Sequence, residues 1–235
     1  MPEGHSGKLF AGVLEDGDGL FSTAAPPDDD FGWKKVFDVN VFGVVNILRV
    51  FVPRLVAAGP LPSGKKTQVV TTSSVMGLFD GAMGLSPYNA SKMACTSICE
   101  MVYHELQLAG EPAAHVATHT LHPSMAGTGI FGGEPTSLAM DPEKEAMMGM
   151  IANGVGDLAG GLTAADVIDG LFAAIGEGKF YCVVDDAKDV PTTEQIRLRM
   201  EGQIGGSAPA TNSPMASMTA LRALMEVEAP AKASL

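Results

Sequence analysis

Apolar residues recur every three or four positions from 31 to 58, and this spacing predicts a long helix that is apolar on more than one face. Asp30 is suited to cap the start of this helix, and Gly59 and Pro60 are suited to end it. Such a helix needs cover on two sides, one from a sheet and the other from a second helix or a partner subunit. The pattern is therefore a first indication of oligomerisation.

Short strand-like runs alternate with helices along most of the chain. Four runs have the length and apolar, often β-branched composition of strands, namely residues 8–13, 67–72, 115–122 and 179–184. A second long helix is predicted over 88–110, and a helix capped by Thr163 over 164–178. This alternation predicts an α/β fold with a parallel sheet flanked by helices.

The polar end of the chain predicts one domain followed by a tail. A short helix is predicted around 193–202, and the following GGSAPATNSP has the composition of a linker. We therefore expect an α/β domain over 1–205 and a flexible C-terminal tail over 206–235.

Composition narrows the function classes. The chain of 235 residues is 46% hydrophobic and carries a net charge of −12, so it should form a core and should be repelled by nucleic acid or an anionic membrane surface. No uninterrupted apolar run has the length of a membrane span. The three cysteines have neither the number of a disulfide framework nor the spacing of a metal site, and Cys95 and Cys99 are interpreted as small apolar packers rather than a redox pair. These features predict a soluble, cytoplasmic protein without a bound metal.

The strand at 67–72 delivers Ser73 and Ser74 to the carboxyl edge of the sheet, where α/β proteins place their chemistry. Tyr88 and Lys92 follow four residues apart, so they share one face of a helix. A nearby ammonium favours the phenolate, and we expect Lys92 to lower the pKa of Tyr88. Ser74 is then placed to donate a hydrogen bond to a substrate carbonyl.

Five segments together resemble the short-chain dehydrogenase/reductase family over roughly residues 8–205. They occur in the family's order and are DVNVFGVVN, QVVTTSSVMG, YNASK, HPSMAGT and KFYCVVDD. The resemblance implies a Rossmann-like fold, NADP or NAD as cofactor, and hydride transfer to a carbonyl or from a secondary alcohol.

The resemblance also implies roles for individual residues. Asn40 would hold a water for proton relay, Ser74 would orient the carbonyl, Tyr88 would be the acid/base, and Lys92 would bind the nicotinamide ribose. Pro123 and Thr128 would complete the cofactor contacts, with Thr128 on the nicotinamide carboxamide.

The family's Gly-rich T-G-x-x-x-G-I-G turn occurs nowhere in the 235 residues, and its N-N-A-G segment is reduced to FAGV at 10–13. In the family's strand order, 3-2-1-4-5-6-7, the chain would begin at the fourth strand. We therefore expect an incomplete doubly wound fold that lacks the first β-α-β-α-β portion and, with it, the adenosine half of the cofactor site.

Two functional hypotheses remain open. The first is an NAD(P)-dependent oxidoreductase of a small hydrophobic carbonyl or alcohol, since methionines crowd residues 125–160 at the place of the family's substrate loop, although they could equally be core filler. The second is a cofactor-free interaction partner. Such a partner would use the two long helices to pair with an intact family member, and for the chain itself the resemblance implies a homodimer through the same helices. His104, His119 and His122 have no companion carboxylate at a telling spacing and are assigned no role.

Overall fold

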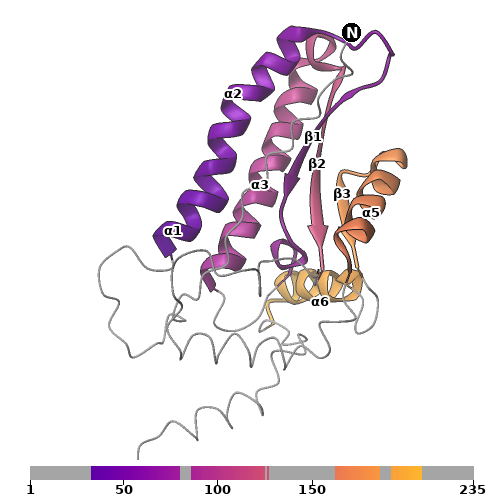
Figure 1. The fold of residues 1–235 in the computed structure, drawn as a ribbon. Coiled ribbons are helices and arrows are strands. Elements are labelled where there is room, and N and C mark those ends of the chain that lie inside the picture. Colours follow the sequence, from indigo (N-terminus) through magenta and orange to yellow (C-terminus); the bar gives the residue numbers. More distant parts are fainter. Residues whose placement is uncertain (1–32, 80–85, 125, 127–161, 186–191, 208–235) are drawn as a thin grey trace, which may run out of the picture.

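A computed structural model of the protein describes residues 33–79, 86–124, 126, 162–185 and 192–207. Its sheet has three parallel strands in the order β1-β2-β3 (Figure 1). They span β1 Thr67–Thr72, β2 Val116–Pro123 and β3 Tyr181–Val184. The predicted α/β class and parallel sheet are confirmed.

Two layers of helix cover the sheet. On one face lie a continuous helical segment and the long helix α3, Ser86–Ala109 (Figure 1). The continuous segment consists of α1 Trp33–Phe37, a π-helical turn η1 Asp38–Phe42, and α2 Gly43–Ala58. α2 ends at Gly59, whose φ of 74° is readily adopted only by glycine.

The opposite face carries α5, Ala164–Gly176 (Figure 1). Thr163 and Asp166 form a reciprocal capping box at its start, as the predicted cap required. Its buried side packs on the strands around a core cluster of Leu121, Val167, Leu171, Ala174, Cys182 and Val184. This packing fixes α5 against the carboxyl halves of β2 and β3.

Some predicted boundaries coincide with the observed ones, and the others differ from them by one to three residues. β1 coincides with its prediction, whereas β3 begins two residues late because the Lys179 N–H is bonded to Ala174 O at the end of α5. The polar helix α6, Thr192–Gly205, is longer than predicted and crosses the carboxyl end of the sheet (Figure 1). The predicted strand at 8–13, Asp30, the loop at 125–160 apart from Ala126, and the tail beyond residue 207 lie outside the described residues.

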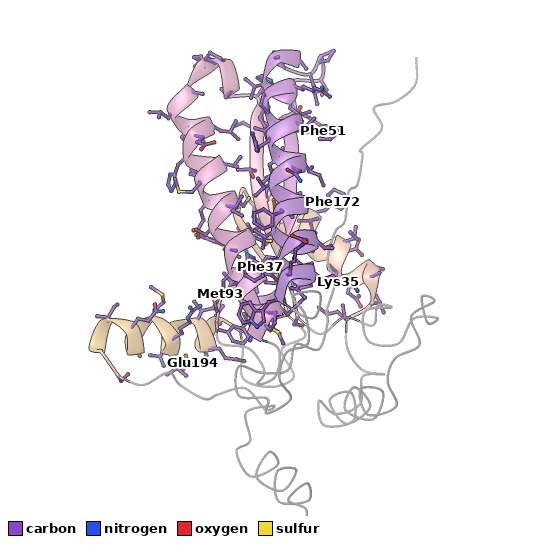
Figure 2. The ribbon with its side chains drawn as sticks, turned by 90° about the vertical axis from the view of Figure 1, so that its left-hand side faces the viewer. Lys35, Phe37, Phe51, Met93, Phe172 and Glu194 are labelled. Atoms are coloured by element: carbon purple, nitrogen blue, oxygen red, sulfur yellow. The ribbon has the colours of Figure 1, made fainter. Side chains whose placement is uncertain are left out.

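Trp33–Ala58 is the one helical segment, within the described ranges, that is long and apolar enough to cross a membrane. Helices of this length and composition also occur in the cores of soluble proteins and in signal sequences. Within the described residues its inner side is covered, whereas Phe42, Val50 and Phe51 are 55%, 44% and 45% exposed. Phe51 lies on the side of α2 that faces away from α3 (Figure 2). The expected second cover of this helix therefore does not come from the described part of the chain.

Candidate active site

The predicted catalytic side chains converge at the carboxyl end of β1. Beyond Thr72 the chain passes through Ser73 and Ser74 into the short 3-10 helix η2, Val75–Gly77. The beginning of α3 packs against this turn, and α6 lies across the same end of the sheet (Figure 1). This is the sheet edge at which parallel α/β folds bind their ligands.

The two serines have different partners. The hydroxyl of Ser73 is buried between Lys92 O, at 2.9 Å, and Thr96 Oγ1, at 3.0 Å, both on α3. Ser74 is extended and caps η2, accepting a bond from Met76 N at 3.2 Å, and its side chain is near enough to Tyr88 to act on the pKa of the phenol. Ser73 therefore ties the strand to the helix, while Ser74 faces the tyrosine.

Lys92 lies beneath the tyrosine and is only 3% exposed. Its Nζ donates to Thr72 O at 3.2 Å and lies 5.5 Å from the centroid of the Tyr88 ring. The spacing of four residues on α3 thus brings the two side chains together, as predicted. Burial lowers the pKa of Lys92, while the neighbouring Cys95 raises it.

The expectation that Tyr88 has a lowered pKa is wrong for the chain by itself. Burial raises the pKa of Tyr88 and outweighs the lowering effect of its hydrogen bond with Ser74. The free-energy cost of taking a phenolate out of water is larger than the stabilisation of the phenolate by Ser74. Tyr88 therefore holds its proton at neutral pH and is poised as an acid.

Asn40 lies in the π-helical turn η1, where the Gly43 N–H donates to Asp38 O five residues back. Such turns often occur at functional sites. The fully buried Asn40 side chain donates from Nδ2 to Ser91 Oγ at 3.0 Å, and Ser91 Oγ donates to Tyr88 O at 2.7 Å. The Asn40 carbonyl accepts a bond from Cys95 Sγ at 2.9 Å. Asn40 is thereby connected to the helical turn that carries the tyrosine.

Supporting residues such as Ser91, Thr120 and His122 were not predicted. Ser91 stands inside the YNASK motif and His122 directly precedes Pro123, so their places next to predicted site residues could have indicated a supporting role. Their hydrogen-bond partners could not be predicted, because these partners belong to distant elements. Cys95 and Cys99 are free and fully buried, which confirms that they pack inside the chain.

Of the two other predicted cofactor contacts, the structure describes one. Pro123 closes β2 opposite Val184, at the same edge as Ser74. Thr128 lies outside the described residues. No group of three or more His, Cys, Asp or Glu suited to a metal ion occurs in the described ranges.

A cavity of about 340 Å³ lies at the other end of the sheet, away from these residues. It is lined by residues that include Lys66, Gln68 and His119 from the amino ends of the strands. His119 is bonded there to Lys179 O and Gln68 Oε1. This cavity is not where the predicted catalytic side chains meet.

Gly77 allows η2 to pack closely on α3. A Cβ at this position would lie 2.2 Å from Ser73 Oγ and 2.8 Å from the backbone carbonyl of Lys92. We expect Gly77→Ala to lower the free energy of unfolding by ~1–3 kcal/mol, because the helix backbone must move. Urea denaturation measures this change. Gly176→Ala is the control, since a Cβ there would meet nothing within 4 Å, and equal stability of the two variants would contradict the expectation.

His122 should make stability depend on pH. Burial lowers its pKa from 6.5 to about 4, the bond to Ser74 O partly opposes this, and Lys92 adds to the lowering. Between about pH 4 and pH 6.5 His122 binds more protons in the unfolded chain than in the folded chain. Its contribution to the free energy of unfolding is therefore fully present above the unfolded pKa of 6.5 and is lost as the pH falls towards about 4. We expect a loss of about 2 kcal/mol from this group between about pH 7 and about pH 5.

Urea denaturation at the two pH values measures the loss, and the His122→Asn variant should lose less. The exposed His104, replaced by Asn, is the matched control and should keep the full dependence. Identical pH dependence in the wild type and the His122→Asn variant would contradict the assignment.

Comparisons with known proteins bear on the family and the fold of the chain. The model of the short chain dehydrogenase family matches residues 11–136. A C alpha-dehydrogenase of Sphingobium sp. is 39% identical over 72 residues, which are 31% of this chain and 21% of that protein. A (-)-trans-carveol dehydrogenase of Rhodococcus erythropolis is 30% identical over 117 residues, which are 49% and 38% of the two chains.

Solved structures show the same fold. A short chain dehydrogenase/reductase of Burkholderia phymatum, solved in complex with NAD, superposes with a TM-score of 0.65 at 29% identity, covering 85% of this chain and 66% of that chain. A short chain dehydrogenase of Burkholderia cenocepacia, in complex with NADP, superposes with a TM-score of 0.55 at 16% identity, covering 84% and 66%. The chain therefore spans less than two thirds of each of these relatives.

Proposed function

The chain belongs to the short chain dehydrogenase family, and on this basis we propose that it is an NAD(P)-dependent oxidoreductase acting on a small apolar carbonyl compound or secondary alcohol. The observation that carries the proposal is the convergence of Ser74, Tyr88 and the buried Lys92 at the carboxyl edge of the parallel sheet, with Lys92 Nζ 5.5 Å from the centroid of the Tyr88 ring. Location in the cytoplasm is part of the same proposal.

The proposed roles follow from the protonation states. In the reductive direction a hydride adds to the carbonyl carbon, and the oxygen gains negative charge. Ser74 donates a hydrogen bond to that oxygen, and Tyr88 gives it the phenolic proton, which burial keeps in place at neutral pH. Lys92 compensates the charge that then remains on the Tyr88 oxygen. Asn40 holds the helical turn that carries Tyr88 through Ser91 and serves the proton relay.

The residues present fit the nicotinamide ribose half of the cofactor. Two buried oxygens, Ser124 Oγ and Asn89 Oδ1, have no hydrogen-bond partner in the described part of the protein, and they stand beside Pro123 and Tyr88 in the chain. Lys92 and Tyr88 supply further polar contacts. When bound, the nicotinamide supplies or accepts the hydride. That Thr128 contacts the cofactor stays a prediction. That the methionine-rich loop forms an apolar wall of the substrate site stays a prediction as well.

The test is a turnover assay of the purified 235-residue chain at millimolar NADH and NADPH with a panel of apolar ketones. Oxidation of the reduced nicotinamide that depends on the ketone supports the proposal. No turnover with any ketone or with the matching secondary alcohols would overturn it in favour of the second hypothesis, a cofactor-free interaction partner.

We further propose that a second copy of the chain covers the outer side of α2. Phe42, Val50 and Phe51 expose apolar surface there, and Met101 and Leu108 do so on the adjacent α3, at 55% and 90% exposure. Arg49 and Arg54 are also exposed on α2, and each costs ~2.5–3.5 kcal/mol at the centre of a membrane helix. A protein surface accommodates these arginines at its rim, which favours a homodimer over lipid.

Phe51→Asp is expected to shift the chain from a dimer towards a monomer of 24.3 kDa, because a carboxylate would be buried in the contact. Sedimentation at micromolar concentration measures the shift. Phe172→Asp is the matched control and should remain dimeric, because Phe172 is exposed on α5, which covers the opposite face of the sheet (Figure 1). A wild-type chain that sediments as a monomer would refute the contact.

A further inference from the structure

His122 on β2 is completely buried, and the proposed reaction gives it no task. Its Nδ1 lies 2.8 Å from the backbone oxygen of Ser74, and its Nε2 lies 2.8 Å from Thr120 Oγ1. Thr120 is also fully buried. Both ring nitrogens are therefore used, one towards the end of β1 and the other towards the neighbouring residue on the same side of β2.

These partners define the state of the ring. A backbone carbonyl can only accept, so Nδ1 carries the hydrogen and donates to Ser74 O. In the neutral ring Nε2 then has a lone pair and accepts the hydroxyl hydrogen of Thr120. The Ser74 carbonyl thereby selects the tautomer, and the Thr120 hydroxyl, by donating to Nε2, holds the ring in the position in which Nδ1 reaches Ser74.

The bond from His122 matters because the ladder of hydrogen bonds between β1 and β2 stops one residue before Ser74. The last ladder bond runs from Ser73 N to Leu121 O at 2.8 Å. The Ser74 carbonyl accepts from Gly77 N at 2.8 Å within η2, and His122 adds the link from this turn back to β2. His122 thus extends the connection between the two strands to Ser74, whose side chain acts on the pKa of Tyr88.

We propose that His122 and Thr120 are positioning residues that hold the backbone of Ser74 in the orientation in which its hydroxyl meets Tyr88. They act through Ser74, and their role in turnover rests on the proposed function. The arrangement of the ring itself does not depend on it, which allows the two ideas to be tested separately.

The first experiment is NMR of the full chain with isotope-labelled histidine, which distinguishes the two neutral tautomers by their nitrogen shifts. We expect His122 to carry its hydrogen on Nδ1 at neutral pH. Thr120→Val should shift the Nε2 signal of His122, which loses its hydrogen-bond donor, whereas Thr118→Val should not, because Thr118 points to the same side of β2 but is bonded to Cys99. An Nε2–H tautomer in the wild type would overturn the proposal, whether or not the chain is active.

The second experiment compares His122→Asn, whose amide nitrogen can replace Nδ1 as a donor, with His122→Leu, which has no donor. Titration of the Tyr88 ring by NMR of labelled tyrosine should be shifted upwards in the Leu variant and close to wild type in the Asn variant, because only the latter keeps Ser74 against Tyr88. In an active chain kcat should fall ~10- to 100-fold in the Leu variant, with KM little changed and most of the loss restored in the Asn variant.

Equal Tyr88 titration in both variants and the wild type would overturn the proposal. If the Leu variant does not fold, the comparison of Thr120→Val with Thr118→Val decides alone. Absence of turnover together with the expected tautomer would refute the proposed function and leave the positioning of Ser74 intact.

Discussion

Tyr88→Phe is expected to lower kcat/KM by ~10²–10⁴, the usual contribution of a positioned acid or base. The substitution removes only the phenolic oxygen, and the ring remains over Lys92. The proton that the substrate oxygen needs would then have to come from water. The measurement is steady-state turnover with the ketone that the assay above identifies, at saturating cofactor.

Tyr103→Phe is the matched control for this variant. Tyr103 stands on the same helix, where its ring packs edge-on against Phe180 away from the site, and its loss should leave turnover within about twofold. A Tyr88→Phe enzyme that keeps more than about a tenth of the activity would show that another group supplies the proton.

The second large effect concerns cofactor affinity. We expect the 235-residue chain to bind NADH and NADPH at least ~10²-fold more weakly than a relative solved with its cofactor, such as the Burkholderia phymatum protein in complex with NAD, because these 235 residues do not contain the Gly-rich turn. That turn offers several backbone N–H groups to the pyrophosphate, and each charge-assisted bond contributes ~1.5–3 kcal/mol. The motif occurs nowhere in these 235 residues.

Calorimetry of both proteins under one buffer condition measures the difference. Lys92→Gln should weaken the remaining binding further, because Lys92 is the buried cation beside Tyr88. Lys65→Gln, an exposed lysine at the other end of the sheet, serves as the control. Micromolar binding by the 235-residue chain would refute the expectation and would mean that other residues hold the pyrophosphate.

The elements of the fold could be predicted because local patterns define them. β1 is a β-branched run whose bounds match the prediction, and α5 begins at the predicted cap Thr163. The predicted bounds were less accurate where an element ends against another element that is packed on it in space. β3 begins late because Lys179 closes the end of α5, and the outer side of α2 is exposed although its composition called for cover on two sides.

The candidate site shows the same division. By itself the sequence determined that Tyr88 and Lys92 share a helix face and that Ser74 follows a strand. The periods of helices and strands relate residues that are close together in the chain, so they can be recognised in the sequence. Only the tertiary structure decided that Ser73 is bonded to α3, that His122 holds Ser74, and that burial raises the pKa of Tyr88 despite the nearby lysine. Hydrogen-bond partners and desolvation depend on which distant segments surround a group, and a linear pattern of residue types does not contain that information.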